Sequence, residues 1–112
     1  MAEILKLQND AEYYYERGID KSEAGAYIEA VDSFYSALRR DPGNMWIYSE
    51  LGYNFLELGL YGPALKIYYK LLALDKHADI GYLGLMQCFL RDNQVPMALY
   101  YLNMGIENGA LD

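Results

Sequence analysis

The sequence predicts an all-α solenoid of three tandem helix hairpins. Three phrases of similar pattern, YIEAVDSFYSAL, YGPALKIYYKLL and VPMALYYLNMGI, begin 34 residues apart at Tyr27, Tyr61 and Val95. Around each phrase the apolar residues recur at helical spacing in two runs, separated by a short break that contains Gly or Asn. A repeat that holds one helix pair is typical of a stacked array, in which neighbouring units bury a shared core.

The same frame divides the whole chain. Extended in both directions, it gives units at residues 11–44, 45–78 and 79–112, preceded by a lead-in or cap at residues 1–10. Each unit is expected to hold two helices, so six helices are predicted.

Local signals mark the ends of the helices in the first unit. Asn9 followed three residues later by Glu12 is the pattern of a capping box, which predicts the start of the first helix. Gly25 suits a left-handed helix ending before the second helix. The Asp-Pro-Gly sequence at 41–43 then predicts a turn between the first two units.

The later units carry equivalent signals. Asn44 is a favourable N-cap for the first helix of the second unit, and Gly59 suits the ending of that helix. Pro63 and Pro96 fit the first turn of the second helix in their units, because a proline there loses no helical hydrogen bond.

The pattern resembles the tetratricopeptide repeat family from residue 11 to the end. The family signature places Trp, Leu, Gly and Tyr on the first helix of a unit, followed by Ala, Phe, Ala and Pro. With any aromatic accepted at the aromatic positions, the first unit matches at Tyr14, Gly18, Ala30, Phe34, Ala37 and Pro42. The second matches at Tyr48, Leu51, Gly52, Phe55, Ala64 and Tyr68, and the third at Tyr82, Leu85, Phe89 and Ala98. The resemblance implies a right-handed superhelix.

Two departures from the signature predict looser packing. Arg17 and Lys21 stand where the family has Leu and Tyr, so the first helix should be more solvated than its counterparts. Met86 stands where a small residue is usual, which suggests a less closely packed third hairpin.

A narrower likeness covers Leu58–Cys88. This stretch resembles the class II chaperones of bacterial type III secretion, which hold translocator subunits before export. The likeness implies a chaperone function for the chain.

The resemblance also implies where a partner would bind. First helices line the concave face of such arrays, so residues there that do not serve the hairpin core are candidates for a groove that binds a peptide or helix. The predicted groove residues are Tyr15, Ile19, Trp46, Ser49, Glu50, Tyr53, Leu56, Ile80, Leu83, Gln87 and Leu90. Trp46, Tyr53 and Leu83 are the expected anchors. The alternative is that Trp46 and Tyr53 pack as ordinary core.

Some relatives clamp a C-terminal carboxylate with Lys, Asn and Arg on this face. The corresponding positions here carry no cation, being Tyr15, Ile19, Glu50, Ile80 and Gly84. A clamp of that type is therefore not expected.

Composition narrows the class of partner to protein. The net charge of -7 repels phosphate backbones and anionic lipid, which disfavours nucleic acid and membranes. Cys88 is the single cysteine, so no internal disulfide is possible and a reducing cytoplasm fits best. No apolar run suggests a signal peptide or a membrane span.

Nothing in the sequence supports an enzyme, a metal site or a cofactor. Cys88 falls at a core position, and His77 lies in a loop without a second ligand nearby. No Gly-rich phosphate loop, HExxH or paired-Cys motif is present.

The last predicted helix bears an apolar stripe that needs a cover. Leu99, Leu102 and Ile106 lie three and four residues apart, on one helix face. The stripe could dock a second copy or a partner, which makes a structural assembly subunit and a homodimer the alternative to a peptide-binding module. It could equally be covered by a continuation of the chain in a longer protein.

Overall fold

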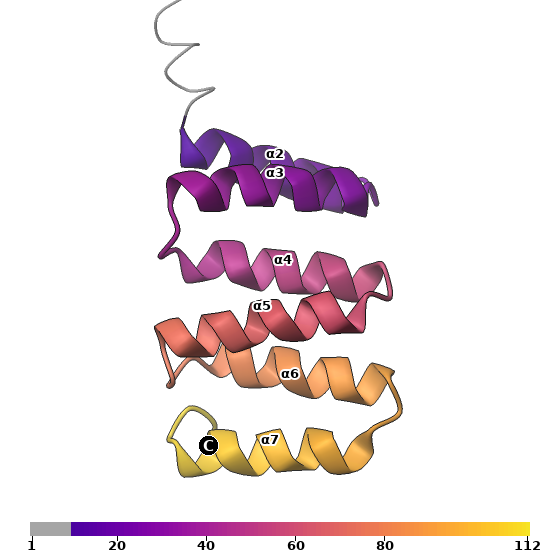
Figure 1. Cartoon of the computed structure of the whole chain (residues 1–112), viewed down its shortest axis with the longest axis vertical. Helices are drawn as coiled ribbons and strands as arrows, with labels where there is room; N and C mark the ends of the chain where they lie inside the picture. Colours follow the sequence, from indigo (N-terminus) through magenta and orange to yellow (C-terminus); the bar gives the residue numbers. More distant parts are fainter. Residues whose placement is uncertain (1–9) are drawn as a thin grey trace, which may run out of the picture.

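The computed structural model describes residues 10–112, which fold into six α-helices arranged as three stacked hairpins (Figure 1). The first hairpin is α2 (Ala11–Glu23) and α3 (Tyr27–Arg40), the second α4 (Met45–Glu57) and α5 (Tyr61–Leu74), and the third α6 (Asp79–Arg91) and α7 (Val95–Glu107). The 34-residue period therefore holds at the start of every helix. No strand occurs among the described residues.

Each hairpin turn closes in the same way. In the second hairpin the Gly59 amide donates to the Leu56 carbonyl and the Leu60 amide to the Phe55 carbonyl, the hydrogen-bond pair of a Schellman ending. Gly59 has φ +73° and Gly25, at the equivalent place, φ +77°, as the sequence predicted. The third hairpin uses Asn93 there instead, with φ 57°.

The loops between units are also built alike. The Asn44 side chain caps α4 by accepting from the Trp46 amide at 3.0 Å, which confirms the predicted N-cap. Tyr48 donates its hydroxyl to the Pro42 carbonyl at 3.0 Å. One period later, Tyr82 donates to the Lys76 carbonyl at 3.1 Å. Each tyrosine thus ties a first helix to the loop before it.

The predicted capping box cannot be placed. Asn9 lies outside the described residues, and the N-cap position of α2 is Asp10, whose side chain makes no capping hydrogen bond.

Glycines let aromatic rings enter the core of the first two hairpins. A Cβ at Gly18 would lie 2.6 Å from Cε1 of Phe34, and a Cβ at Gly52 would overlap the Tyr68 ring. The third hairpin has Met86 in place of the glycine and Leu102 in place of the ring. In this hairpin the first helix supplies a long side chain and the second helix a side chain smaller than a ring.

The first helix is more solvated than its counterparts, as predicted. The only buried residue of α2 is Gly18, whereas α4 and α6 bury residues along their whole length. Arg17 is exposed at the position that Leu51 and Leu85 occupy in the core of the later units. Lys21 reaches Glu29 of α3 in an ion pair of 2.9 Å.

Candidate functional site

The first helices of the three units share one face of the molecule. Besides successive helices, the backbone pairs that approach each other are α2 with α4 and α4 with α6. In the view of Figure 1, α2 lies partly behind α3 and α6 partly behind α5. The face formed by α2, α4 and α6 is where the sequence placed the groove.

A hollow of about 190 Å³ opens on this face between α4 and α6. Its walls come from both helices and its floor from α5. The lining residues are Ser49, Tyr53, Tyr68, Ile80, Leu83, Gly84 and Gln87. Five of these were predicted groove residues, brought together from two units. Tyr68 and Gly84 were not predicted as lining.

The Tyr68 ring shapes the floor of the hollow. It rises from α5 and passes between Gly52 of α4 and Gly84 of α6, since a Cβ added to either glycine would overlap it. The side chain is 4% exposed, and burial is the main cause that raises the pKa of its hydroxyl far above the ordinary value. Gly84 occupies the position in the third unit that Glu50 occupies in the second. Its lack of a side chain was the sequence signal for this role.

Large apolar side chains on α4 and α6 stay open to solvent, and Tyr53 and Leu83 among them line the hollow. Tyr53 is 43% exposed, Leu83 45% and Trp46 62%, and Leu90 is also exposed. The alternative that Trp46 and Tyr53 are ordinary core residues is therefore wrong.

Other predicted groove residues lie elsewhere. Leu56 is 2% exposed and belongs to the core, so its assignment to the groove is wrong. The reason is that α4 is flanked by both α2 and α6, which leaves only a narrow strip of its surface open. Tyr15 and Ile19 are half-buried and pack against the core, with the Tyr15 ring edge-on to Phe34 at 5.8 Å between centroids.

A second hollow of about 240 Å³ lies beside the first, at the N-terminal ends of α4 and α6. Ile80 lines both hollows. The remaining lining residues are Met45, Trp46, Leu71, Asp75, His77, Ala78 and Asp79. The two hollows and the exposed Trp46 extend the groove along the array.

The other end of the groove is closed by an ion pair between units. Arg91 of α6 contacts Glu57 of α4 at 3.1 Å and also donates to the Leu56 carbonyl at 3.4 Å. Glu50, nearer the middle of α4, is half-buried, and desolvation raises the pKa of its carboxyl.

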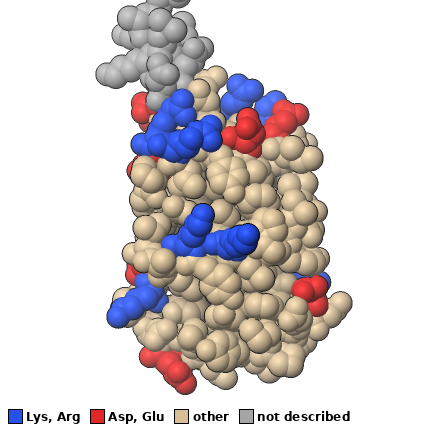
Figure 2. All heavy atoms as spheres, in the orientation of Figure 1, with Lys and Arg blue, Asp and Glu red and all other residues tan. Residues whose placement is uncertain are grey.

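Charge is unevenly spread over the face that Figure 2 shows, on which α3 and α5 lie in front of α2 and α6. Figure 2 shows charged side chains gathered over the first unit and at the edges, with a broad uncharged area elsewhere. Basic side chains interrupt this area at the height of α5, which carries Lys66 and Lys70.

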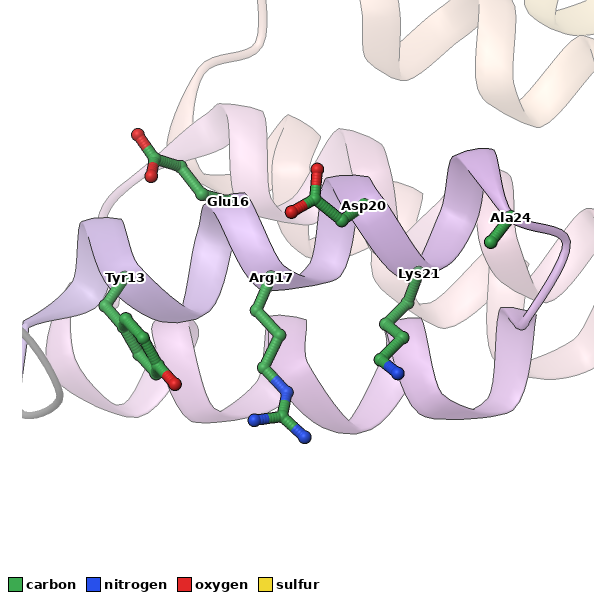
Figure 3. A pocket seen from close by; sticks show the side chains of 6 residues that line it. All are labelled: Tyr13, Glu16, Arg17, Asp20, Lys21 and Ala24. Atoms are coloured by element: carbon green, nitrogen blue, oxygen red, sulfur yellow. The ribbon is translucent and has the colours of Figure 1, made fainter.

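A larger hollow of about 590 Å³ runs along α2, but a single helix lines it. Tyr13, Arg17 and Lys21 project from one side of α2, while Glu16 and Asp20 project from another (Figure 3). This is the polar outer surface of the first unit, with charges of both signs and no second wall. We do not count it as a binding site.

The residues with reactive side chains are held in structural positions. Cys88 is 1% exposed, and burial raises the pKa of its thiol to about 11, which keeps it protonated at neutral pH. His77 Nδ1 lies 2.8 Å from the Asn108 carbonyl and so links a loop to the end of α7. Within residues 10–112 no group of three or more His, Cys, Asp or Glu side chains could hold a metal.

The outer face of α7 carries the predicted apolar stripe. Leu99 is 53% and Ile106 45% exposed, and Leu102 is half-buried. In the second unit the residue equivalent to Ile106 is Leu72, which packs over Gly81 of α6. The face that a following helix covers on α5 is thus left open on α7.

These hairpins define the class of protein. The chain has the tetratricopeptide repeat fold, an all-α right-handed superhelical solenoid of three helix hairpins. The Yersinia enterocolitica type III secretion translocator chaperone SycD matches it with a TM-score of 0.83 at 20% sequence identity, over 91% of this chain and 76% of that chain. Solved structures with this fold therefore include members of both groups that the sequence resembles, tetratricopeptide repeat domains and type III secretion chaperones.

Two further solved structures have the same fold. The first TPR domain of Spaghetti (RPAP3), bound to the HSP90 peptide SRMEEVD, matches with a TM-score of 0.79 at 18% identity, over 88% of this chain and 79% of that chain. MamA matches with a TM-score of 0.81 at 19% identity, over 89% of this chain and 58% of that one, so this chain spans little more than half of MamA. No protein-family model and no curated protein match the sequence.

None of the helices described in residues 10–112 has both the length and the apolar character needed to cross a membrane.

Proposed function

We propose that the chain is a protein-interaction module that holds an apolar segment of a partner protein in the groove, as an adaptor or chaperone. The observation that carries this proposal is the hollow between α4 and α6, with Tyr53 and Leu83 exposed around it. Its volume of about 190 Å³ is below the roughly 300 to 1,000 Å³ of small-molecule sites, and suits one large side chain of a peptide.

The solved neighbours support the same class of function. The RPAP3 domain was solved with a bound HSP90 peptide, SycD is a translocator chaperone, and another structure of this fold is a complex of CopN with Scc3. A shared fold does not fix a shared ligand, so the local surface is the main support.

Substitutions in the groove should weaken partner binding. Tyr53→Ala combined with Leu83→Ala removes two expected anchors, and the affinity for the partner should fall about 100-fold or more. The partner is first captured by cross-linking in the native cell and identified by mass spectrometry. Its affinity for wild-type and variant chains is then measured by calorimetry with both proteins purified.

A matched control removes apolar side chains that are at least as exposed from other helices. Ile28 of α3 is 74% exposed and Leu74 of α5 48%. The Ile28→Ala and Leu74→Ala double variant should bind within about twofold of wild type. Equal losses in the two double variants, or no loss in the groove variant, would refute the groove.

A second candidate function is assembly through the outer face of α7, for which the exposed Leu99 and Ile106 are the specific observation. A second structure of SycD is an alternative dimer, so association between copies occurs with this fold. Here the partner surface would be the same stripe on a second copy.

Light scattering separates the two candidates. If the α7 face drives assembly, the wild-type chain should be dimeric at high micromolar concentration, and Leu99→Glu should make it monomeric. The groove variant should then leave the dimer intact. A strictly monomeric wild type would remove the assembly candidate.

A narrower form of the chaperone proposal is a type III secretion translocator chaperone. It is supported by the Leu58–Cys88 stretch and by the likeness to the SycD fold. The proposed location is the cytoplasm, because the lone Cys88 needs no oxidising compartment. Co-expression with a translocator subunit should keep that subunit soluble only when Tyr53 and Leu83 are present.

A further inference from the structure

Glu50 is a carboxylate beside the first hollow, and no cation pairs with it among residues 10–112. It lies on α4 one residue after Ser49 and three before Tyr53, so it sits beside the hollow on the open strip of the helix. The ion pairs of the described residues join Lys21 to Glu29 and Arg91 to Glu57, and neither involves Glu50.

The charge of this carboxylate reaches tyrosines of three helices. Burial is the first cause that raises the pKa of Tyr15 of α2, and the charge of Glu50 is the second. Glu50 also adds to the burial and other charges that raise the pKa of Tyr53 of α4 and Tyr68 of α5. Of these tyrosines, Tyr53 follows Glu50 by three residues on the same helix and is exposed to solvent, so it lies beside the carboxylate on the surface of α4.

Such a setting favours a cation. A half-buried carboxylate has lost part of its hydration, and within the described chain nothing compensates for the loss. An ammonium or guanidinium group can pair with the carboxylate and lie against the face of the Tyr53 ring at the same time. The net charge of -7 would attract a basic segment as it approaches.

We propose that Glu50, with Tyr53, forms a subsite for a Lys or Arg side chain of the partner, next to the hollow that takes its apolar side chain. The inference rests on the proposed function and adds the chemistry of the partner segment. Residues three apart on a helix have Cβ atoms about 5 to 6 Å apart, which an extended peptide spans in about two residues. The basic residue should therefore lie within about two residues of the apolar anchor. The partner would differ in charge from the acidic peptide SRMEEVD of the RPAP3 complex.

Peptide selection tests this directly. A phage library of random 12-residue peptides is selected against wild type, Glu50→Gln and the Tyr53→Ala, Leu83→Ala double variant. Wild type should select peptides with an apolar residue and a Lys or Arg at a fixed offset. Glu50→Gln should keep the apolar residue and lose the basic one, and the double variant should select neither.

Synthetic peptides then give the size of the effect. Glu50→Gln should weaken the best basic peptide about fivefold, but should change the affinity of its Lys→Gln or Arg→Gln version by less than about twofold. Glu50→Lys should bind the version with Glu at that position better than wild type does. Circular dichroism and a melting curve establish that each variant is folded.

The outcomes separate the inference from the proposal beneath it. Apolar peptides that depend on Tyr53 and Leu83 but show no basic preference would overturn the cation subsite and leave the groove standing. Wild type that selects no groove-dependent peptide would overturn the proposed function, and the subsite with it. A peptide like SRMEEVD that binds as well as the basic peptides would also overturn the subsite.

Discussion

The Tyr68 ring joins the core to the groove. It is part of the buried cluster, yet it forms the floor of the hollow because Gly52 and Gly84 leave room on both sides. A change at either glycine therefore acts on stability and on the binding surface together.

Gly84→Ala should destabilise the chain and deform the hollow. Its new Cβ would overlap Tyr68, so we expect a loss of about 1 to 3 kcal/mol in the free energy of unfolding. Gly62 on α5 is the matched control, since apart from its chain neighbours and the backbone of its own helix no atom lies within 4 Å of a Cβ placed there. Gly62→Ala should change the free energy of unfolding by less than about 1 kcal/mol, because the better helix propensity of alanine is offset by crowding against the ring of Pro63. Chemical denaturation measures both. Equal effects would show that the ring does not occupy this slot.

Glu50 should make the stability of the chain depend on pH. Desolvation raises the pKa of its carboxyl in the folded state, so the ionised form destabilises the fold. The cost is full above the folded-state pKa and disappears as pH falls below the ordinary value of 4.5. The groups near it, Tyr15, Tyr53 and Tyr68, have pKa values raised from 10.0 and stay protonated in this range.

The measurement is a comparison of wild type with Glu50→Gln by denaturation between pH 4 and pH 7. Glu50→Gln should be the more stable at pH 7, and the difference should shrink as pH falls. A difference that grows towards low pH would mean that Glu50 is stabilised by a partner in the fold.

The sequence could place much of the groove, but not its floor. Tyr53, Leu83 and Ile80 could be predicted as groove residues, because helical spacing and the repeat frame together fix which side of a first helix faces the groove. Tyr68 was assigned to the hairpin core, since no pattern in a single helix shows that a ring passes between two others. Leu56 was misplaced for a similar reason, because spacing along α4 does not reveal how closely its neighbours enclose it.

At the scale of the element, one turn departs from the repeat. The first two hairpins have glycine in the left-handed position of the turn, and the third has Asn93 at φ 57°. Asparagine tolerates this region better than most residues but less well than glycine. The third hairpin therefore has a turn with some backbone strain.

Asn93→Gly should relieve that strain and stabilise the chain by about 0.5 to 1 kcal/mol. Gly59→Ala, at the equivalent position, should destabilise by about 1 kcal/mol. Thermal unfolding followed by circular dichroism compares the two with wild type. A stabilising Gly59→Ala would contradict the left-handed geometry.

Helix positions were the most predictable part of the fold. The period and the glycine and proline signals placed all six helices, because a strict repeat supplies the same information three times. The N-caps of α3, α5, α6 and α7 were not foreseen, and the structure shows no side-chain capping hydrogen bond at any of them.

At the scale of the molecule, the three hairpins differ in how many neighbouring hairpins they pack against. The second hairpin packs against a hairpin on each side, whereas α7 contacts only α6 through its backbone and has an open outer face. Stability in such arrays is the sum of the stability of each unit and of the contacts between neighbours.

The backbone amides of α7 should therefore exchange with solvent before those of α4. We expect protection about tenfold or more lower in α7, measured by hydrogen exchange and mass spectrometry. A partner bound only in the groove should protect α4 and α6 first. Uniform protection along the array would show that the three hairpins unfold as one unit.

The charged outer surface of α2 limits how copies of this chain can grow into larger objects. An open filament needs the last helix of one copy to mate with the first helix of the next, and here an apolar stripe would meet Arg17, Asp20 and Glu16. That mismatch disfavours head-to-tail polymerisation of the described residues. If copies associate through α7, as the second candidate function proposes, two like faces would pair and growth would stop at two copies.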